Sequence, residues 1–486
     1  MTALPLPAPR HPLRRAAATV RMHLPTFSPS HFPTAPRLLL IALAAALTGC
    51  ITSPKAPQVT PPERAKAARV DTGDFAWGFS SSSWQYENRT VAKDGKLPFR
   101  TDWDVLMDQG KAPARGNTVV MSWSEFDRDV RALKKIGATH YRFSLEWARI
   151  EPQPGQYDEA AINRYVEMTR RLKAAGIEPV VCLWHFTFPE WLYDPAQPKK
   201  SNWLHPEADA RWQAYVNKVV PRLKPHVKFF APQNEPNGQL ATAYLNGLWP
   251  PAMTAALGTY AAAVRASARQ FRQAAAIIKR HRPDAIVMSV QALPWWNKGW
   301  LDPTRAAYNG MMRMNFDHLD MIADVCDVIG FNYYYSQIAG PLAALGIGSH
   351  RGPNFTEMGW DIDPAGLYKQ IRLVDKRYGK PMMITENGIA TADEAQRKRY
   401  LEEHIAAVQQ AREDGHDVRG YFVWSLLDNY EWHYGFDATF GLARMNPQTF
   451  ARELKPAAFT YRDIIRRGGV KNIPDAVVRA ARRSTR

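Results

Sequence analysis

Two hydrophobic periodicities alternate along the chain from residue 75 onward. Short runs rich in Val, Ile, Phe and Tyr, such as HYRFSLEW (140–147) and EPVVCLWHF (178–186), have the composition of buried strands. Longer segments, such as AAINRYVEMTRRLKAAG (160–176) and ADARWQAYVNKVVPRLK (208–224), place apolar residues at spacings of three and four, which predicts amphipathic helices. A helical segment follows each strand-like run.

The same alternation continues to the C-terminal part of the chain. The other predicted strands are FAWGFSSS (75–82), KFFAPQNEP (228–236), AIVMSVQAL (285–293), DVIGFNYYY (327–335), PMMITENG (381–388) and VRGYFVWSLLD (418–428), and further predicted helices are EFDRDVRALKKIG (125–137), YAAAVRASARQFRQAAAIIKRHRP (260–283) and PAAFTYRDIIRRG (456–468). Eight strand–helix units predict an α/β fold, a single (β/α)8 TIM barrel over residues 70–468. A doubly wound open sheet is the alternative, but no glycine-rich dinucleotide fingerprint follows the first strand.

A barrel fold directs attention to the residues at the strand ends, because barrel active sites lie at the C-terminal ends of the strands. These positions carry an unusual mixture of polar, acidic and aromatic side chains for a core, namely Gln85, Arg142, His185, Asn234, Glu235, Asn332, Tyr334, Glu386 and Trp424. Sugars offer hydroxyl groups for hydrogen bonding and flat C–H faces for stacking on aromatic rings. The set therefore predicts a carbohydrate ligand.

Two of these strand-end residues are carboxylates, Glu235 in QNEPNG (233–238) and Glu386 in ITENG (384–388). Their strands, the fourth and seventh predicted, lie across a barrel mouth from each other, so the two side chains are expected to face one another over a substrate. Hydrolysis of a glycosidic bond needs such a pair, because one carboxyl protonates the leaving oxygen and the other stabilises or attacks the anomeric carbon. A lone strand-end glutamate is more often a surface or ion-paired residue, and position alone leaves either role open to either residue.

Composition and charge are consistent with a large barrel that binds a carbohydrate. A hydrophobic content of 45% and 16 Trp favour a large packed core over disorder. The net charge of +17 would suit nucleic-acid binding, but residues 1–64 and residues 466–486 each hold seven Lys/Arg against one Asp/Glu. The two ends thus supply +12 and leave about +5 for the folded body. Without a basic stripe in that body, binding to nucleic acid is not predicted.

The N-terminal segment has the features of a targeting sequence. Several arginines precede LLLIALAAAL (38–47), an apolar run of signal-peptide length that is too short to span a bilayer comfortably. The run ends in Leu47-Thr48-Gly49-Cys50, which resembles a bacterial lipobox with Cys50 as the lipidation site. We expect a lipoprotein-type signal peptide over residues 1–49, starting at Met1 or Met22, and a bacterial cell-envelope protein held to the membrane by the lipid alone. An ordinary signal peptide with a coincidental cysteine is the alternative.

The segments next to the barrel are expected to be simple. Proline-rich residues 53–62 predict an extended tether over residues 50–69, and residues 469–486 form a basic C-terminal tail. Cys182 and Cys326 lie in apolar, strand-like runs and are expected to be core thiols, not a disulfide or a metal pair. No CxxC or HExxH motif occurs, so neither a metal nor another cofactor is predicted.

Several motifs together resemble one enzyme family. The segments YRFSLEWARIEP, LWHFTFPEWL, QNEPNG, DVIGFNYYY, MGWDIDPAGLY, ITENG and WSLLDNYEW look like those of glycoside hydrolase family 1, the β-glucosidase and β-galactosidase barrels. The resemblance runs in order from about residue 75 to residue 465. It implies a retaining exo-β-glycosidase that releases a terminal sugar, expected to be glucose, through a covalent glycosyl–enzyme. An endo-acting glucanase, a transglycosidase and a non-catalytic sugar-binding lipoprotein are the alternatives.

The resemblance also implies roles that the spacing leaves open. Glu235 matches the acid/base of the NEP motif, and Glu386 matches the nucleophile of the TENG motif. The residues matching those that contact and tune the nucleophile are Arg142, Tyr334 and Asn332. The residues matching the sugar site are Gln85, His185, Asn234, Glu431 and Trp432, with Trp424 as stacking platform and Phe440 as outer wall.

Glu431 bears on the choice of sugar. Family members that act on 6-phosphorylated sugars carry a smaller residue there, and a carboxylate repels a phosphate by like charge, so a non-phosphorylated sugar is expected. The choice among glucose, galactose, fucose and mannose is left open, as is the oligomeric state.

Other positions bear on the outer part of the site and on its support. The candidates to line the outer site are Trp296, Trp300 and Trp360. Residues 116–130 depart from the family pattern, which leaves the shape of the first long loop open. Glu146 in SLEW is a further acid near a strand end, and we expect it to support the site from behind.

Overall fold

The computed structural model describes residues 74–299, 302, 304–340 and 354–482 of the chain. The predicted signal peptide, the lipobox with Cys50 and the tether lie outside these residues, as does Trp300.

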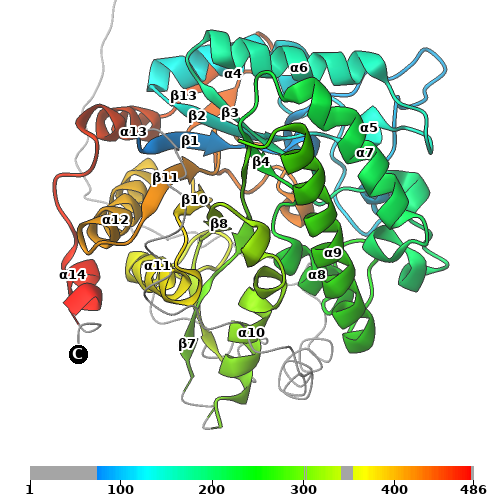
Figure 1. The fold of residues 1–486 in the computed structure, drawn as a ribbon. Coiled ribbons are helices and arrows are strands. Elements are labelled where there is room, and N and C mark those ends of the chain that lie inside the picture. The colour runs from blue at the N-terminus through cyan, green and yellow to red at the C-terminus, as the bar shows by residue number, and fades with distance from the viewer. Residues whose placement is uncertain (1–73, 300–301, 303, 341–353, 483–486) are drawn as a thin grey trace, which may run out of the picture. The chain divides into compact units, whose positions relative to one another are not determined.

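Parallel strands occupy the centre of the described region, and helices surround them (Figure 1). The central strands are β1 (Ala76–Ser80), β2 (His140–Ser144), β3 (Glu178–Cys182), β4 (Phe229–Ala231), β5 (Ile286–Val287), β6 (Gln291–Ala292), β8 (Ile329–Asn332), β10 (Met382–Asn387) and β11 (Val418–Val423). The long helices that follow them in turn are α4 (Ser122–Ile136), α6 (Glu159–Ala174), α7 (Ala208–Leu223), α9 (Leu257–His281), α10 (Ala306–Asp320), α11 (Pro364–Tyr378), α12 (Glu394–Glu413) and α13 (Pro456–Arg467).

The segment that contains β5 and β6 closes the sheet on itself. The strand order is β5-β4-β3-β2-β1-β11-β10-β8-β6, and the pairing within this sheet is parallel. β5 pairs with β4, and β6 pairs with β8. Because β5 and β6 are pieces of one extended segment, residues 286–292, the two ends of the sheet are the same stretch of chain. Counting that segment once, the described residues form eight barrel strands and eight long helices, so the predicted (β/α)8 barrel is confirmed.

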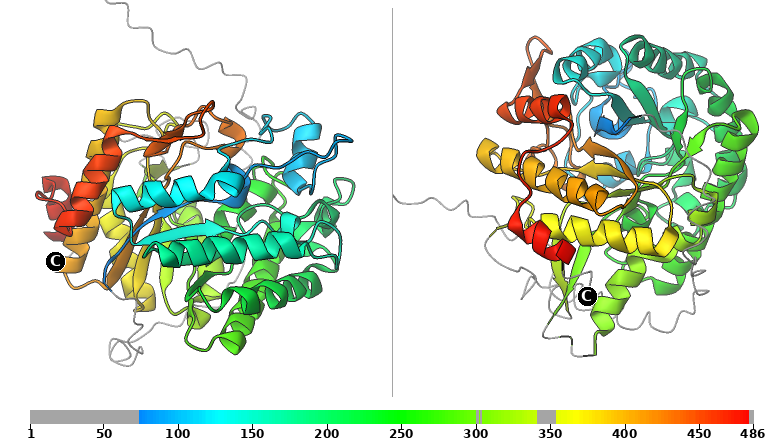
Figure 2. Two further views of the ribbon diagram at one scale, coloured as in Figure 1. Left: turned by 90° about the horizontal axis from the view of Figure 1, so that it is seen from above. Right: turned by 60° about the vertical axis from the view of Figure 1, so that its left-hand side comes forward.

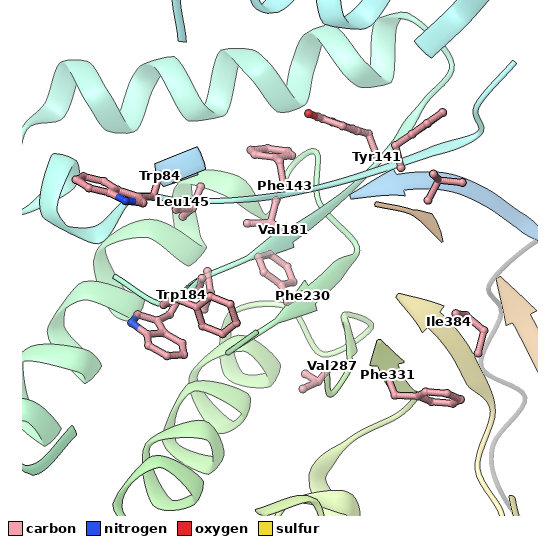
Figure 3. Close-up of a cluster of buried hydrophobic side chains, with 14 of the residues drawn as sticks. Trp84, Tyr141, Phe143, Leu145, Val181, Trp184, Phe230, Val287, Phe331 and Ile384 are labelled. Atoms are coloured by element: carbon pink, nitrogen blue, oxygen red, sulfur yellow. The ribbon is translucent and has the colours of Figure 1, made fainter. Parts of the chain in front are cut away.

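Side chains along the strands alternate between the barrel interior and the layer beneath the helices. Figure 3 shows part of the outward layer, with Tyr141, Phe143, Val181, Phe230, Val287 and Phe331 carried by successive strands. A separate inward cluster includes Val180, Phe229, Met288 and Phe422. Burial on both faces explains why the strands are continuous apolar runs in the sequence. Cys182 and Cys326 are both buried free thiols, as predicted.

Local signals in the sequence set the limits of the outer helices. Asp158 caps α6 by accepting a hydrogen bond from the Ala161 N–H at 2.9 Å. α4 ends at Ile136, and the next residue, Gly137, has a φ of 89°, the left-handed conformation that glycine adopts without strain. α4 begins at Ser122, earlier than the predicted residue 125, and it follows Met121 at φ 58°. The hydrophobic pattern did not reveal this first turn because it contains few core-facing residues.

The described residues also form several shorter elements outside the barrel strands and the eight long helices. They are α2 (Ser83–Tyr86), α3 (Asp102–Asp108), α5 (Trp147–Ile150), α8 (Pro236–Tyr244), α14 (Asp475–Arg482), the pairs β7 (Trp295–Lys298) with β9 (Ser336–Ala339) and β12 (Ala443–Met445) with β13 (Arg452–Leu454), and the 3-10 turns η4 (Glu190–Leu192), η5 (Pro198–Lys200), η6 (Asn202–Leu204), η7 (Ala323–Val325) and η9 (Trp432–Tyr434). α14 forms part of the predicted basic tail and packs against α11 and α12, as the red helix in Figure 2 shows. None of the helices in the described ranges has the length and apolar character needed to cross a membrane.

Candidate active site

β10 ends near Glu386, and an irregularity in this strand turns the side chain toward the barrel mouth. The register of β10 against β8 shifts between Ile384, opposite Phe331, and Glu386, opposite Asn332. Such bulges bend a strand and redirect its side chains, often next to active sites. Glu386 is only 4% exposed, so neighbouring groups must stabilise its charge.

The other residues of the ENG motif hold the end of this strand. The Asn387 side chain donates to the Tyr333 carbonyl oxygen and accepts from the Tyr421 hydroxyl, each at 2.5 Å. A Cβ atom on Gly388 would lie 1.8 Å from the Trp424 carbonyl oxygen. Only glycine therefore permits this close approach of the chain after β10 to the chain after β11. Hydrogen bonds therefore account for Asn387, and the close packing of the two chain segments accounts for Gly388.

Arg142 and Tyr334 donate hydrogen bonds to the Glu386 carboxylate. Arg142 lies in the middle of β2, not at the strand end where the sequence analysis placed it, and its Nη1 is 2.5 Å from Oε1. The Tyr334 hydroxyl lies 2.6 Å from Oε2. The second terminal nitrogen of Arg142 donates to Asn234 Oδ1 at 2.5 Å. A guanidinium and a hydroxyl that donate to a carboxylate in a desolvated site both favour its ionised form.

Glu235 lies between β4 and α8 and has a different set of partners. Its backbone has a φ of 39°, and its N–H donates to the Val290 carbonyl oxygen at 2.8 Å. Its Oε1 accepts from Asn332 Nδ2 at 2.8 Å, and Asn332 Oδ1 accepts from the Thr385 hydroxyl at 2.7 Å. A positive φ in a non-glycine residue costs energy and persists only where the surroundings enforce it. Glu235 is thus held in place by a neutral amide, whereas a cation holds Glu386.

These partners give the two carboxyls different pKa behaviour. Burial raises the pKa of Glu235 to about 8, and the negative charge of Glu386 acts in the same direction. Burial also raises the pKa of Glu386, but Arg142 and Tyr334 oppose that rise. We infer that the shared proton resides on Glu235 and the charge on Glu386. One protonated and one ionised carboxyl at a barrel mouth are the two groups that glycosidic-bond cleavage requires.

The structure brings the predicted sugar-binding residues together beside this pair. Asn234 Nδ2 lies 3.2 Å from His185 Nε2, and burial lowers the pKa of His185 well below its usual value. Within the described part of the chain, the Nδ1 atom of this neutral imidazole has no hydrogen-bond partner. Gln85 Nε2 donates to Glu431 Oε2 at 3.2 Å. Neutral and acidic groups in this arrangement can both donate to and accept from sugar hydroxyls.

Glu431 is also surrounded by negative charge. Burial raises its pKa to about 8, and the charges of Glu386 and Glu235 push it in the same direction. Hydrogen bonds from Trp424 and Gln85 favour the ionised form and limit the rise. An environment in which a carboxylate already resists ionisation disfavours any further negative group on a ligand.

Aromatic residues extend outward from the carboxylate pair. Trp424 and Phe440 are buried in one cluster, and Tyr334, Met358 and Trp360 pack against it. Trp360 reaches Tyr334 and Phe440 at ring-centroid distances of 5.7 and 6.3 Å. The structure therefore joins Trp360 to the site.

Trp296 lies farther from this cluster. Its indole nitrogen donates to Asn315 Oδ1 at 3.2 Å, and its ring meets Tyr335 at 6.4 Å.

Sequence reasoning missed an aromatic group around Trp432. Trp103, Trp249 and Phe186 lie 4.7, 5.4 and 5.3 Å from Trp432, measured between ring centroids. Phe186 directly follows His185, so the sequence offered a signal for it. Trp103 lies in the short helix α3 and Trp249 in the loop between α8 and α9, and neither segment shows a clear hydrophobic period. Such rings restrict how Trp432 can move.

Comparisons with known proteins agree with this geometry. The model of the family described as Glycosyl hydrolase family 1 matches residues 70–298 and 303–470. Over 451 residues the chain is 28% identical to "Beta-glucosidase A" of Acetivibrio thermocellus, covering 82% of this chain and 98% of that protein. It is 29% identical over 452 residues to the "Bifunctional beta-D-glucosidase/beta-D-fucosidase" of Bifidobacterium breve, covering 80% and 97%.

A solved structure gives the same result in three dimensions. The "beta-glycosidase from Pyrococcus horikoshii" matches with a TM-score of 0.71 and 31% sequence identity. The match covers 84% of this chain and 96% of the other. It therefore spans the barrel and the loops that carry the carboxylate pair.

Proposed function

The chain belongs to glycosyl hydrolase family 1, and on that premise we propose that it is a retaining exo-β-glycosidase that releases terminal glucose from the non-reducing end of β-glycosides. It is an O-glycosyl hydrolase of the β-glucosidase type, and the names of its relatives support glucose as the sugar. The assignment of roles to the two carboxyls is based on their different hydrogen-bond donors. Arg142 and Tyr334 donate to Glu386, whereas the Asn332 amide donates to Glu235.

In the first step, the ionised Glu386 attacks the anomeric carbon. A bond forms between its carboxylate oxygen and that carbon as the glycosidic C–O bond breaks, and the proton of Glu235 passes to the leaving oxygen. The product is a glycosyl ester on Glu386 with inverted configuration. Arg142 and Tyr334 prepare this step by keeping Glu386 charged while it is buried.

In the second step, water releases the sugar. Glu235, now ionised, removes a proton from water, whose oxygen attacks the anomeric carbon and displaces the Glu386 carboxylate. A second inversion restores the β configuration, and both carboxyls return to their starting protonation states. Transglycosylation would differ only in that a sugar hydroxyl takes the place of water.

The choice of sugar can be tested with a panel of nitrophenyl β-glycosides of glucose, galactose, fucose and mannose. We expect kcat/KM to be highest for the glucoside and 6-phosphoglucoside to be a poor substrate, because Glu431 lies among carboxylates. A mannoside or galactoside preference would contradict the choice of glucose, and no turnover of any member would contradict the enzyme assignment. Incubation with a long β-glucan provides the control, since random internal cuts would indicate an endo-acting enzyme.

The N-terminal sequence supports a further proposal about location. Leu47-Thr48-Gly49-Cys50 follows an apolar run of signal-peptide length, and we propose that Cys50 is lipidated and anchors the enzyme to a bacterial cell envelope. The anchored enzyme would then act on glycosides outside the cytoplasm.

Cys50→Ser tests this location directly. In a bacterial host that processes lipoproteins, we expect the variant to lose lipid labelling and to leave the membrane fraction, because the only predicted attachment is removed. Cys182→Ser serves as the matched control, since that thiol is buried inside the barrel. A Cys50→Ser protein that is processed normally and stays with the membrane would show that the lipobox interpretation is wrong.

A further inference from the structure

Glu146 is a buried acid that the two-step mechanism does not use. It lies two residues after β2 and caps α5, where its Oε1 accepts from the Ala148 N–H at 3.3 Å. Only 1% of its surface is exposed. In the part of the chain that the structure describes, Glu146 forms no ion pair, and burying a carboxyl without a bonded cation is costly.

Two hydroxyl groups from neighbouring loops donate to Glu146. The Thr187 hydroxyl lies 3.1 and 3.0 Å from Oε1 and Oε2, and the Ser83 hydroxyl lies 3.3 Å from Oε2. Thr187 is two residues beyond His185, and Ser83 is two residues before Gln85. One side chain thus connects the two segments that present these sugar-binding candidates. They are residues 81–101 after β1, which include the short helix α2 and are called the Gln85 loop, and residues 183–189 after β3, called the His185 loop.

A second connection holds the other side of the Gln85 loop. The Glu146 N–H donates to the Tyr165 hydroxyl at 3.0 Å, and that hydroxyl donates to Glu87 Oε2 at 3.0 Å. Glu87 also pairs with Arg149 at 3.0 Å. Because Ser83 and Glu87 lie on either side of Gln85, the 146–149 segment fixes that residue from both directions.

The chemistry of a carboxyl suits this position. Thr187, Ser83 and the Ala148 N–H supply three donors, and a carboxylate offers two oxygens with room for all of them. A serine or an alanine in its place could not reach both loops. Burial and the charge of Glu87 raise the pKa of Glu146 to about 7. The ionised form of this carboxyl is therefore unfavourable in the folded protein, as is typical of residues kept for function and not for stability.

We propose that Glu146 is a positioning residue that fixes the Gln85 and His185 loops relative to each other and thereby sets the affinity for the sugar in the deepest part of the site. The proposal rests on the proposed function of that site. It does not place Glu146 in contact with the substrate, and its effect reaches the sugar through Ser83 and Thr187.

The test compares Glu146→Ala with Glu146→Gln on nitrophenyl β-glucoside. For the alanine variant we expect KM and the inhibition constant of glucose to rise together, by about 10-fold or more, while kcat changes by less than about 3-fold. The glutamine variant keeps one acceptor oxygen and should recover most of the affinity. The effect should be the same for different leaving groups, because Gln85 and His185 are assigned to the sugar.

Glu151→Ala is the matched control. Glu151 ends the same short helix, is fully buried, and accepts from Trp147 Nε1 and the Gly155 N–H, each at 2.8 Å. These partners belong to neither sugar-binding loop, so we expect the control to lose stability with an unchanged KM. An equal rise in KM in both variants, or an unchanged KM in Glu146→Ala, would overturn the proposal.

Two milder variants cover the case in which Glu146→Ala does not fold. Ser83→Ala and Thr187→Val each break one connection, and each should raise KM by a smaller factor, whereas an unchanged KM in both would contradict the proposal. The wild-type measurement separates the two hypotheses. If the wild type hydrolyses glucosides but these variants keep its KM, only the role of Glu146 is wrong; a wild type without hydrolytic activity would overturn the function and this role together.

Discussion

Glu386→Ala is expected to lower kcat on a nitrophenyl β-glucoside by about 10⁴-fold or more, because it removes the only group proposed to form the covalent intermediate. Glu235 and the sugar-binding residues remain, so KM should change far less than kcat. Measuring kcat and the binding of glucose on the same preparation separates loss of chemistry from loss of the site.

Azide or formate should restore part of this activity. Truncation leaves Arg142 Nη1 and the Tyr334 hydroxyl, previously 2.5 and 2.6 Å from the carboxylate, facing a space that an anion can enter. Both groups donate hydrogen bonds, and the guanidinium is buried, so the vacated site attracts small negative ions. An anion that attacks from this side inverts the anomeric carbon, and the expected product is the α-glycosyl azide or α-glycosyl formate.

Glu235→Ala supplies the reciprocal control. It leaves Glu386 able to form the glycosyl ester, and azide that enters beside the ester should displace Glu386 to give the β-glycosyl azide. The configuration of the two azide products, read by proton NMR, therefore assigns each carboxylate to one face of the sugar. A β product from Glu386→Ala, or normal turnover without added anion, would show that the assignment of the nucleophile is wrong.

The fold could be predicted from the sequence because the strand pattern, the helix pattern and the positions of the polar residues all indicated the same barrel. Strands buried on both faces are apolar throughout, the outer helices show a clear three-to-four spacing, and polar residues gather where the strands end. The family resemblance then implied which carboxylate attacks. The structure adds a physical basis for that choice, since Arg142 donates to Glu386 while Asn332 donates to Glu235.

What escaped prediction depends on geometry that a linear pattern does not contain. The register shift that turns Glu386 inward is a relation between β10 and β8. The rings around Trp432 come from segments far apart in the sequence, and α14 is too short to stand out within a basic segment. Glu146 was expected to support the site, but its two connections to the sugar-binding loops depend on hydroxyls whose role the sequence does not mark.

Glu235→Gln tests the second carboxyl with little change in shape. Glutamine keeps an oxygen that can accept from Asn332 Nδ2, but its amide is not acidic enough to transfer a proton to the leaving group. We expect kcat/KM for alkyl glucosides, whose leaving groups need protonation, to fall by about 10²- to 10⁴-fold. For dinitrophenyl glucoside, whose leaving group departs unaided, formation of the glycosyl ester should be nearly normal. An equal loss on both substrates would contradict the role of general acid.

The pH dependence of the same variant gives an independent check. Wild-type kcat/KM should fall as pH rises through the Glu235 pKa of about 8, because the acid loses its proton, and this alkaline limb should disappear in Glu235→Gln. The stability of the wild type should also fall as pH rises. A folded-state pKa raised from 4.5 to about 8 means that the wild type loses stability between these pH values, since the unfolded chain ionises first. Glutamine escapes that loss, so thermal unfolding should show a variant similar to wild type at pH 4 and several degrees more stable at pH 8. A variant that is less stable than the wild type at pH 8, or that keeps the alkaline limb, would show that burial of Glu235 in its protonated form is not the basis of its catalytic role.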